Sequence, residues 1–231
     1  MRAPWYWGPH VVGGAELGAE RRKIERDERL TRRIESFSDL VIGFSLALLA
    51  LTLSIPPHIV ELLTNPWWLI AYFWTFAVIA GIWYTHQRLF TRFFWPETFS
   101  IVLNFVLLSM LGLLVYFVQA FVHYHTAFDR VWAFIAYFAV LGIAFIAMGT
   151  LYFHGARRRW DDLDTGERYV AVLQTLRGIV GGLFMLVGAL VTALRPVSSM
   201  DDVRPLAIFV FAGLIGTRIA ARVLRSRIVA A

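Results

Sequence analysis

Four long stretches without Asp, Glu, Lys or Arg constrain the fold of this chain more than any other feature. They run from Leu40 to Val60, from Leu62 to Gln87, from Thr98 to Phe128 and from Val131 to Ala156. The hydrocarbon core of a bilayer is roughly 30 Å thick, and a helix of about 20 apolar residues crosses it. Each stretch is long enough for this, so the sequence predicts at least four transmembrane helices.

Two shorter apolar stretches raise the number to six. Gly178 to Leu194 gives a fifth span, and Pro205 to Thr217 gives a sixth if the side chains of Arg204 and Arg218 extend toward opposite interfaces. The composition agrees, because 58% of residues are hydrophobic and 16% charged, against about 45–50% and 25% in soluble domains. We therefore predict an all-α membrane protein without a large aqueous domain. The predicted spans cover about residues 37–56, 66–87, 99–121, 131–154, 170–194 and 204–223.

The basic residues predict how these spans are oriented. Eighteen of the 22 Lys and Arg residues fall in segments that six spans would place on one side, and three fall in the opposite loops. Basic residues concentrate on the cytoplasmic side of membrane proteins. We expect a multi-pass protein of the cell membrane with both termini in the cytoplasm, and this arrangement explains the net charge of +6 without a nucleic-acid partner.

Three parts of the chain follow from the predicted spans. Residues 1–36 form a cytoplasmic arm and charged helix, residues 37–227 the transmembrane domain, and residues 228–231 a C-terminal tail. The chain has no cysteine, which excludes disulfide frameworks and thiolate metal sites. Close packing of the last two spans is predicted from their small residues. These are Gly178, Gly181, Gly182, Gly188, Gly213 and Gly216.

The first span carries two stripes at helical spacing. One is hydroxyl-bearing, with Ser38, Ser45 and Thr52 recurring every seven residues, and fits either interhelical packing or a functional surface. Asp39 lies at the cytoplasmic end of this span and needs solvent, a proton or a partner; His86, at the end of the second span, is expected at the same depth. The other stripe is apolar and fits core or lipid contact. It consists of Phe37, Val41, Phe44, Leu48, Leu51 and Ile55.

The motif Arg33-x-x-x-Phe37-Ser38-Asp39 resembles the signature of the transmembrane protein 175 family, the lysosomal potassium channels and their prokaryotic relatives. Trp83-x-x-His86 is similar to the family's pattern at the end of its second span. Asn104, followed by Leu107 and Leu108, resembles the opening of its third span. The resemblance covers roughly residues 33–120.

The resemblance implies a homotetramer in a lipid bilayer, with the first span of each subunit lining a central cation pore. It implies a hydrophobic constriction at Phe44, Leu48 and Leu51. Ala47 replaces a threonine that faces the pore in relatives, which leaves Ser45 and Thr52 as candidate pore hydroxyls. The family's polar residues hold the pore helix in place. Their counterparts in this sequence are Arg33, Phe37, Ser38, Asp39, Trp83, His86 and Asn104.

The sequence therefore predicts a cation channel, with potassium as the expected ion, a hydrophobic gate, no catalytic residues, no metal site and no cofactor. A secondary transporter is one alternative, although the predicted spans are continuous and lack visible repeats. A haem-bearing membrane oxidoreductase is another. It would use histidines at the two membrane faces, such as His86 and His154 on one side and His123 on the other.

Overall fold

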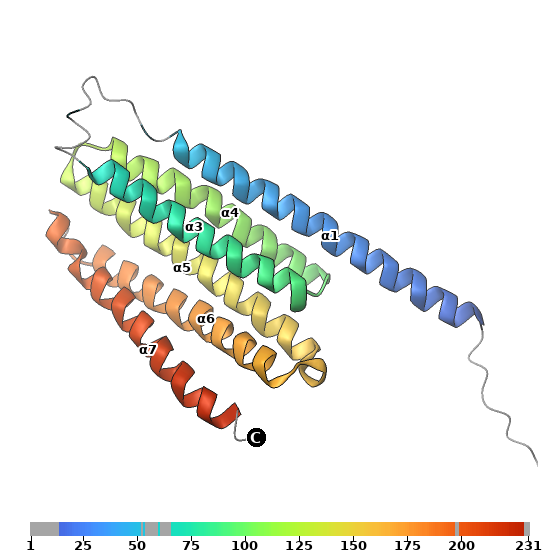
Figure 1. The fold of residues 1–231 in the computed structure, drawn as a ribbon. Coiled ribbons are helices and arrows are strands. Elements are labelled where there is room, and N and C mark those ends of the chain that lie inside the picture. Colours follow the sequence, from blue (N-terminus) through green and yellow to red (C-terminus); the bar gives the residue numbers. More distant parts are fainter. Residues whose placement is uncertain (1–13, 52, 54–59, 61–65, 197–198, 229–231) are drawn as a thin grey trace, which may run out of the picture.

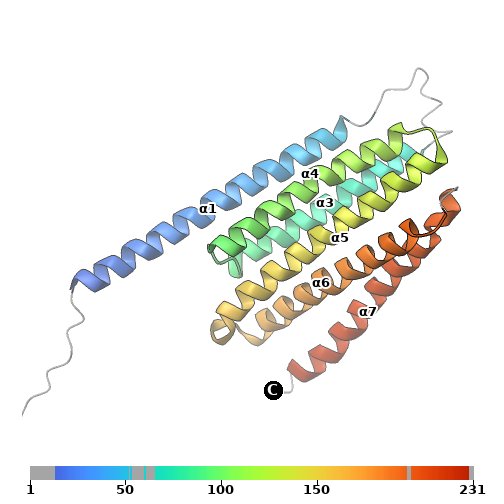
Figure 2. The same ribbon diagram turned by 180° about the vertical axis from the view of Figure 1, so that it is seen from behind.

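The computed structural model describes residues 14–51, 53, 60, 66–196 and 199–228. All regular structure in these residues is helical. Long helices lie side by side, with α1 at one edge of the layer and α7 at the other (Figures 1 and 2). The helices are α1 (Gly14–Ala50), α3 (Trp67–Arg92), α4 (Thr98–His123), α5 (Ala127–Arg158), α6 (Thr165–Ala193) and α7 (Arg204–Ile228), with short 3₁₀ turns η1 (Trp160–Asp162) and η2 (Met200–Val203).

Among the described residues, five helices are long and apolar enough to cross a membrane: α3, α4, α5, α6 and the segment from Met200 to Ala220 that includes most of α7. The prediction of an all-α protein with several membrane-spanning helices is confirmed. The side of the membrane on which each terminus lies, and the exact number of spans, stay predictions.

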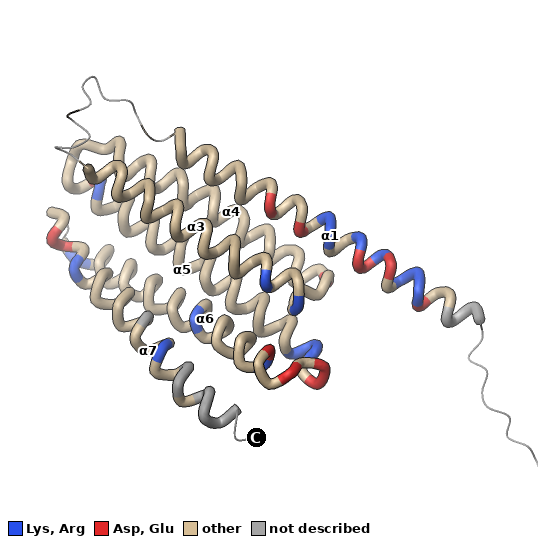
Figure 3. The backbone as a smooth tube through the Cα atoms, in the orientation of Figure 1, with Lys and Arg blue, Asp and Glu red and all other residues tan. Residues whose placement is uncertain are grey.

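Helix α1 differs from the others in length and charge. Its 37 residues extend roughly 55 Å at 1.5 Å per residue, which is more than a bilayer core requires. Its N-terminal half is rich in charged residues and projects beyond the other helices, whereas the middle of the bundle is nearly free of charge (Figure 3). Helix α1 passes residue 36 without a break, so the charged arm and the first predicted span share one continuous helix.

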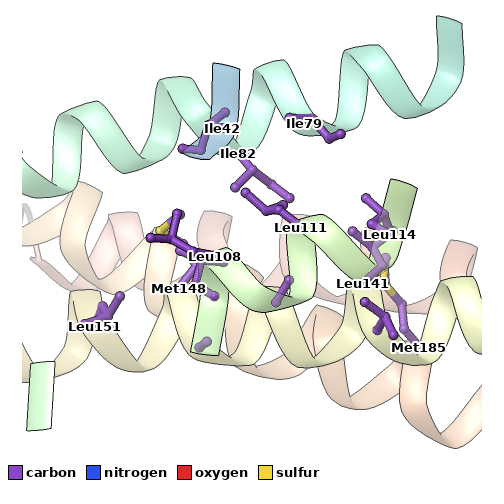
Figure 4. Close-up of a cluster of buried hydrophobic side chains, with 14 of the residues drawn as sticks. Ile42, Ile79, Ile82, Leu108, Leu111, Leu114, Leu141, Met148, Leu151 and Met185 are labelled. Carbon is purple, nitrogen blue, oxygen red and sulfur yellow. The ribbon is translucent and has the colours of Figure 1, made fainter. Parts of the chain in front are cut away.

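The core lies between the central helices. Leucines of α4, such as Leu108 and Leu111, face Ile42 of α1 and Ile79 of α3 on one side and Met148 of α5 on the other (Figure 4). All are buried. Among the described helices, α3 and α4 are the ones that make substantial contacts with α1. The face of α1 that points away from them is not covered within this subunit.

Some of the glycines predicted to join the last two spans instead bring α6 close to α5. Gly178 of α6 lies against Gly149 of α5, where a Cβ atom on Gly178 would sit 2.5 Å from the Gly149 Cα. Gly182 likewise meets α5 at Gly142. Only Gly188 and Gly213 contribute close contacts between α6 and α7. The prediction that all these glycines join the last two spans was therefore wrong for Gly178 and Gly182, because a small residue permits close approach without identifying the partner helix.

Candidate functional site

Helix α1 has one buried face and one exposed face. Ser38, Ile42, Ser45 and Leu49 are buried against α3 and α4. They recur at intervals of three or four residues, which places them on one side of a helix. This face fixes how α1 is rotated about its own axis within the subunit.

The predicted constriction residues lie on the other face. Phe44 is 60% exposed, Leu48 51% and Leu51 78%. Phe37 and Leu40 extend the same exposed stripe toward the N-terminus of the helix. Within this subunit, Phe37, Phe44, Leu48 and Leu51 of the predicted apolar stripe therefore face away from the core. Val41 is partly buried and packs against the core, and Ile55 lies outside the described residues.

The candidate pore hydroxyls do not share this exposed stripe. Ser45 is 4% exposed, and its hydroxyl donates a hydrogen bond to the Val41 carbonyl oxygen of its own helix at 2.9 Å. Thr52 lies outside the described residues. Ser45 reaches the exposed side only if α1 rotates, and such a rotation would expose Ile42 and Leu49.

A buried chain of hydrogen bonds joins α1, α4 and α3. The Ser38 hydroxyl donates to the Ile34 carbonyl oxygen at 2.8 Å, and the Asn104 amide nitrogen donates to Ser38 Oγ at 2.9 Å. Asn104 Oδ1 lies 2.9 Å from His86 Nε2. All three side chains are fully buried, and a buried polar group without a partner is costly, so this chain fixes the register of three helices.

The direction of each hydrogen bond identifies the histidine tautomer. The Ser38 hydroxyl has a single proton, which bonds Ile34, so Ser38 Oγ accepts from Asn104. Asn104 then presents its carbonyl oxygen to His86, which must donate from Nε2. His86 Nδ1 is buried without a hydrogen-bond partner among the described residues. The imidazole also packs against the Phe90 ring, with 4.6 Å between ring centroids.

Asp39 is held by a second set of contacts. The Trp83 indole nitrogen donates to Asp39 Oδ1 at 3.0 Å, and the Gln87 amide donates to the same oxygen at 2.5 Å. The partner of Asp39 comes from α3, as expected for a carboxylate at this depth. It is not His86, whose ring points to Asn104. Sequence reasoning missed Gln87, although it lies four residues after Trp83 and so on the same helix face.

Two of the seven residues in the predicted polar network lie apart from it. Arg33 is exposed and makes no ion pair with a described residue. Phe37 packs edge-on against Phe105 of α4, with 5.7 Å between ring centroids, and makes an apolar contact only. Nearby, burial and then the negative charge of Asp39 raise the pKa of the Glu35 carboxyl. The remaining five residues, joined by Gln87, dock α1 onto α3 and α4.

Comparison with known proteins identifies relatives of this segment. Residues 33–115 match the family model of the endosomal/lysosomal potassium channel TMEM175. A protein named potassium channel from Marivirga tractuosa is 34% identical over 84 residues, which cover 36% of this chain and 34% of the relative. The match therefore spans about a third of the length of that protein.

The fold as a whole is similar to a solved channel. The crystal structure of a variant of the potassium channel MtTMEM175, in complex with a nanobody fusion protein, matches with a TM-score of 0.59. The match covers 84% of this chain and 93% of the solved chain at 20% identity. At this identity the likeness establishes the fold. Together with the apolar helices, these findings describe a multi-pass membrane protein.

Proposed function

Because residues 33–115 match the family model of the endosomal/lysosomal potassium channel TMEM175, we propose that this protein is a cation channel whose pore is lined by α1. The observation that carries the proposal is the division of α1 into two faces. One face is docked through Ser38, Asp39 and Ile42, while Phe44, Leu48 and Leu51 project outward from the edge of the bundle. Copies of α1 from four subunits would place these side chains around a common axis.

Phe44, Leu48 and Leu51 then form the gate. A ring of apolar side chains excludes water, and a cation passing it would lose its hydration without replacement oxygens. Such a ring blocks conduction when narrow and permits it when wider. The polar contacts of Asp39 and Asn104 would hold each α1 helix against its own subunit, so that the apolar stripe faces the axis.

Potassium is the ion named in both relatives, and we propose it as the permeant ion. Selection over sodium would not depend on a hydroxyl ring at the level of Ala47 or Ser45. Ala47 has none, and Ser45 is buried and bonds its own helix. Flux in opposed potassium and sodium gradients measures this selection directly.

The gate is tested by making it polar. Leu48→Ser or Leu51→Ser should raise cation flux into liposomes, because each change adds a hydroxyl where water is excluded and narrows no part of the pore. Leu183→Ser is the matched control: Leu183 is 49% exposed but lies on α6, which makes no substantial contact with α1. Unchanged flux in both α1 variants would show that this face of α1 does not line the pore.

No observation favours the two alternative functions. The helices α3 to α6 are continuous over their full lengths, unlike the interrupted helices typical of transporter sites. The Nε2 atoms of His86 and His154 are engaged by Asn104 and Glu97, so neither presents a free Nε2 to a haem iron.

A further inference from the structure

Two adjoining cavities lie at the end of the bundle where α3 begins and α4 ends. Each has a volume of about 680 Å³, within the range of about 300–1,000 Å³ typical of ligand sites. Their walls share Trp68, Val122 and Arg130. The two cavities are therefore neighbouring parts of one surface, formed by α3, α4 and α5.

The first cavity is almost entirely apolar. Ala71 and Trp74 of α3 form one wall, and Phe134 and Phe138 of α5 form another. A surface of this kind is suited to a hydrocarbon chain rather than to a polar solute. Trp67 and Trp68 also line it, at the start of α3, and tryptophan is enriched where helices meet the membrane–water interface.

The second cavity is the more polar of the two, and its lining includes basic side chains. His123, His125 and Arg130 line it together with Gln119 and Tyr116, and none of the described residues in its lining is acidic. Arg130 uses its Nε–H to donate to the Tyr124 carbonyl oxygen at 2.6 Å. None of the described carboxylates lies within ion-pair distance of its guanidinium group, so its remaining N–H groups are available to an anion.

We propose that these cavities bind one phospholipid with an anionic headgroup. One acyl chain would occupy the apolar cavity, and the phosphate would lie beside Arg130, where the two cavities meet. We identify the ligand as an anionic phospholipid from charge complementarity. A basic polar pocket joined to an apolar groove at the membrane edge matches an amphipathic anion, and Arg binds phosphate through paired N–H groups. The polar cavity also includes Leu51, so the headgroup would lie beside the end of α1.

The test measures lipid retained by the purified full chain. After exchange into detergent and incubation with phosphatidylglycerol or phosphatidylcholine, native mass spectrometry counts the bound lipids. Wild-type protein should retain phosphatidylglycerol in preference to phosphatidylcholine. Arg130→Gln should reduce that preference about tenfold, because a charge-assisted hydrogen bond to the phosphate is lost. Arg195→Gln, which changes an exposed arginine outside both cavities, should leave it unchanged.

A substitution that fills the apolar cavity tests whether an acyl chain binds there. Ala71→Phe should abolish retention of both lipids, whereas Ala77→Phe, on the exposed side of the same helix, should not. If Ala71→Phe fails to fold, Val122→Trp tests the same point, because Val122 lines both cavities. Equal retention by wild type and the cavity-filling variant would overturn the proposal. The proposal would also be overturned if the wild-type protein retained no lipid and the cavity-filling variant changed its oligomeric state. That result would indicate that a second subunit covers this surface.

Discussion

At the scale of single residues, Asn104 has the most consequential position in the candidate site. It is the only side chain that bonds both Ser38 of α1 and His86 of α3 among the described residues, and it is fully buried. An amide supplies a donor and an acceptor in one group, and here each is used by a different helix. Loss of Asn104 would leave His86 Nε2 buried without its partner and would break the bond to Ser38 Oγ, which would keep only its bond to the Ile34 carbonyl oxygen.

Asn104→Leu should therefore lower the free energy of unfolding in detergent by about 1–3 kcal/mol, the usual cost of a buried polar group left unpaired. Ser109→Ala is the control. Ser109 is an exposed residue of the same helix whose hydroxyl bonds only the Phe105 carbonyl oxygen, so its loss should cost little. Equal stability of the two variants would show that the buried chain does not hold the helices.

Glu97 gives a prediction about pH. It precedes α4, lies 3.2 Å from His154 Nε2 and is bonded by Arg158 at 2.9 Å. Burial alone would raise the pKa of the Glu97 carboxyl, but the hydrogen bonds and charges of His154 and Arg158 outweigh it and hold the pKa below its usual value of 4.5. A carboxyl whose pKa is lowered by folding contributes its full stabilisation when the pH is above its pKa in the unfolded chain. This contribution is lost as the pH falls through its pKa in the folded chain.

Wild-type protein should therefore melt at a higher temperature than Glu97→Gln at about pH 7, and the difference should shrink and then disappear as the pH falls below 4.5 and through the lowered pKa. Thermal unfolding of both proteins in the same detergent across this range is the measurement. A difference that persists unchanged at acidic pH would mean that the carboxylate charge is not what stabilises this end of the bundle.

The sequence predicted which residues gather at the site better than it predicted which of them contact one another. Helical spacing correctly separated Phe44 and Leu48 from Ser38 and Ser45, because both sets follow one helix whose periodicity is local. The partner of Asp39 depends on the relative depth and rotation of α3, which local spacing does not determine. His86 and Gln87 are adjacent in sequence, yet only Gln87 reaches the carboxylate.

At the scale of helices, the contact between α5 and α6 depends on the absence of side chains. A Cβ atom on Gly178 would meet the Phe145 carbonyl oxygen at 2.5 Å as well as the Gly149 backbone, and backbone atoms cannot move aside without shifting a helix. Small residues permit such approach in membrane proteins. Glycine spacing revealed that a close contact exists, but only the packed structure identifies α5 as the partner.

Gly178→Ala should consequently separate α5 from α6 and lower the unfolding temperature by several degrees, as expected for overpacking that costs about 1–3 kcal/mol. Gly181→Ala is a matched control on the same helix, because a Cβ atom there would meet nothing within 4 Å. Alanine also favours helix over glycine, so Gly181→Ala should be neutral or stabilising. A destabilisation of equal size in both variants would contradict the packing account.

At the scale of the whole molecule, the helices divide into two regions. Helices α4, α5 and α6 form the buried centre, while α1 lies at one edge with its outer face exposed. The positions of α3, α4, α5 and α6 follow from apolar length, which the sequence displays directly. Whether the outer face of α1 lines a pore depends on the arrangement of several copies, which no single chain determines.

The most direct test of the pore is chemical access to α1 during ion flux. Since the chain has no cysteine, a single introduced cysteine is the only thiol. Leu48→Cys and Leu51→Cys should each give a potassium flux into liposomes that changes sharply when a charged, membrane-impermeant thiol reagent is added, because the reagent attaches inside the conduction path. Leu49→Cys on the buried face and Leu183→Cys on α6 should give fluxes that do not respond. If flux through the Leu48→Cys and Leu51→Cys proteins is equally insensitive to the reagent, α1 does not line the pore.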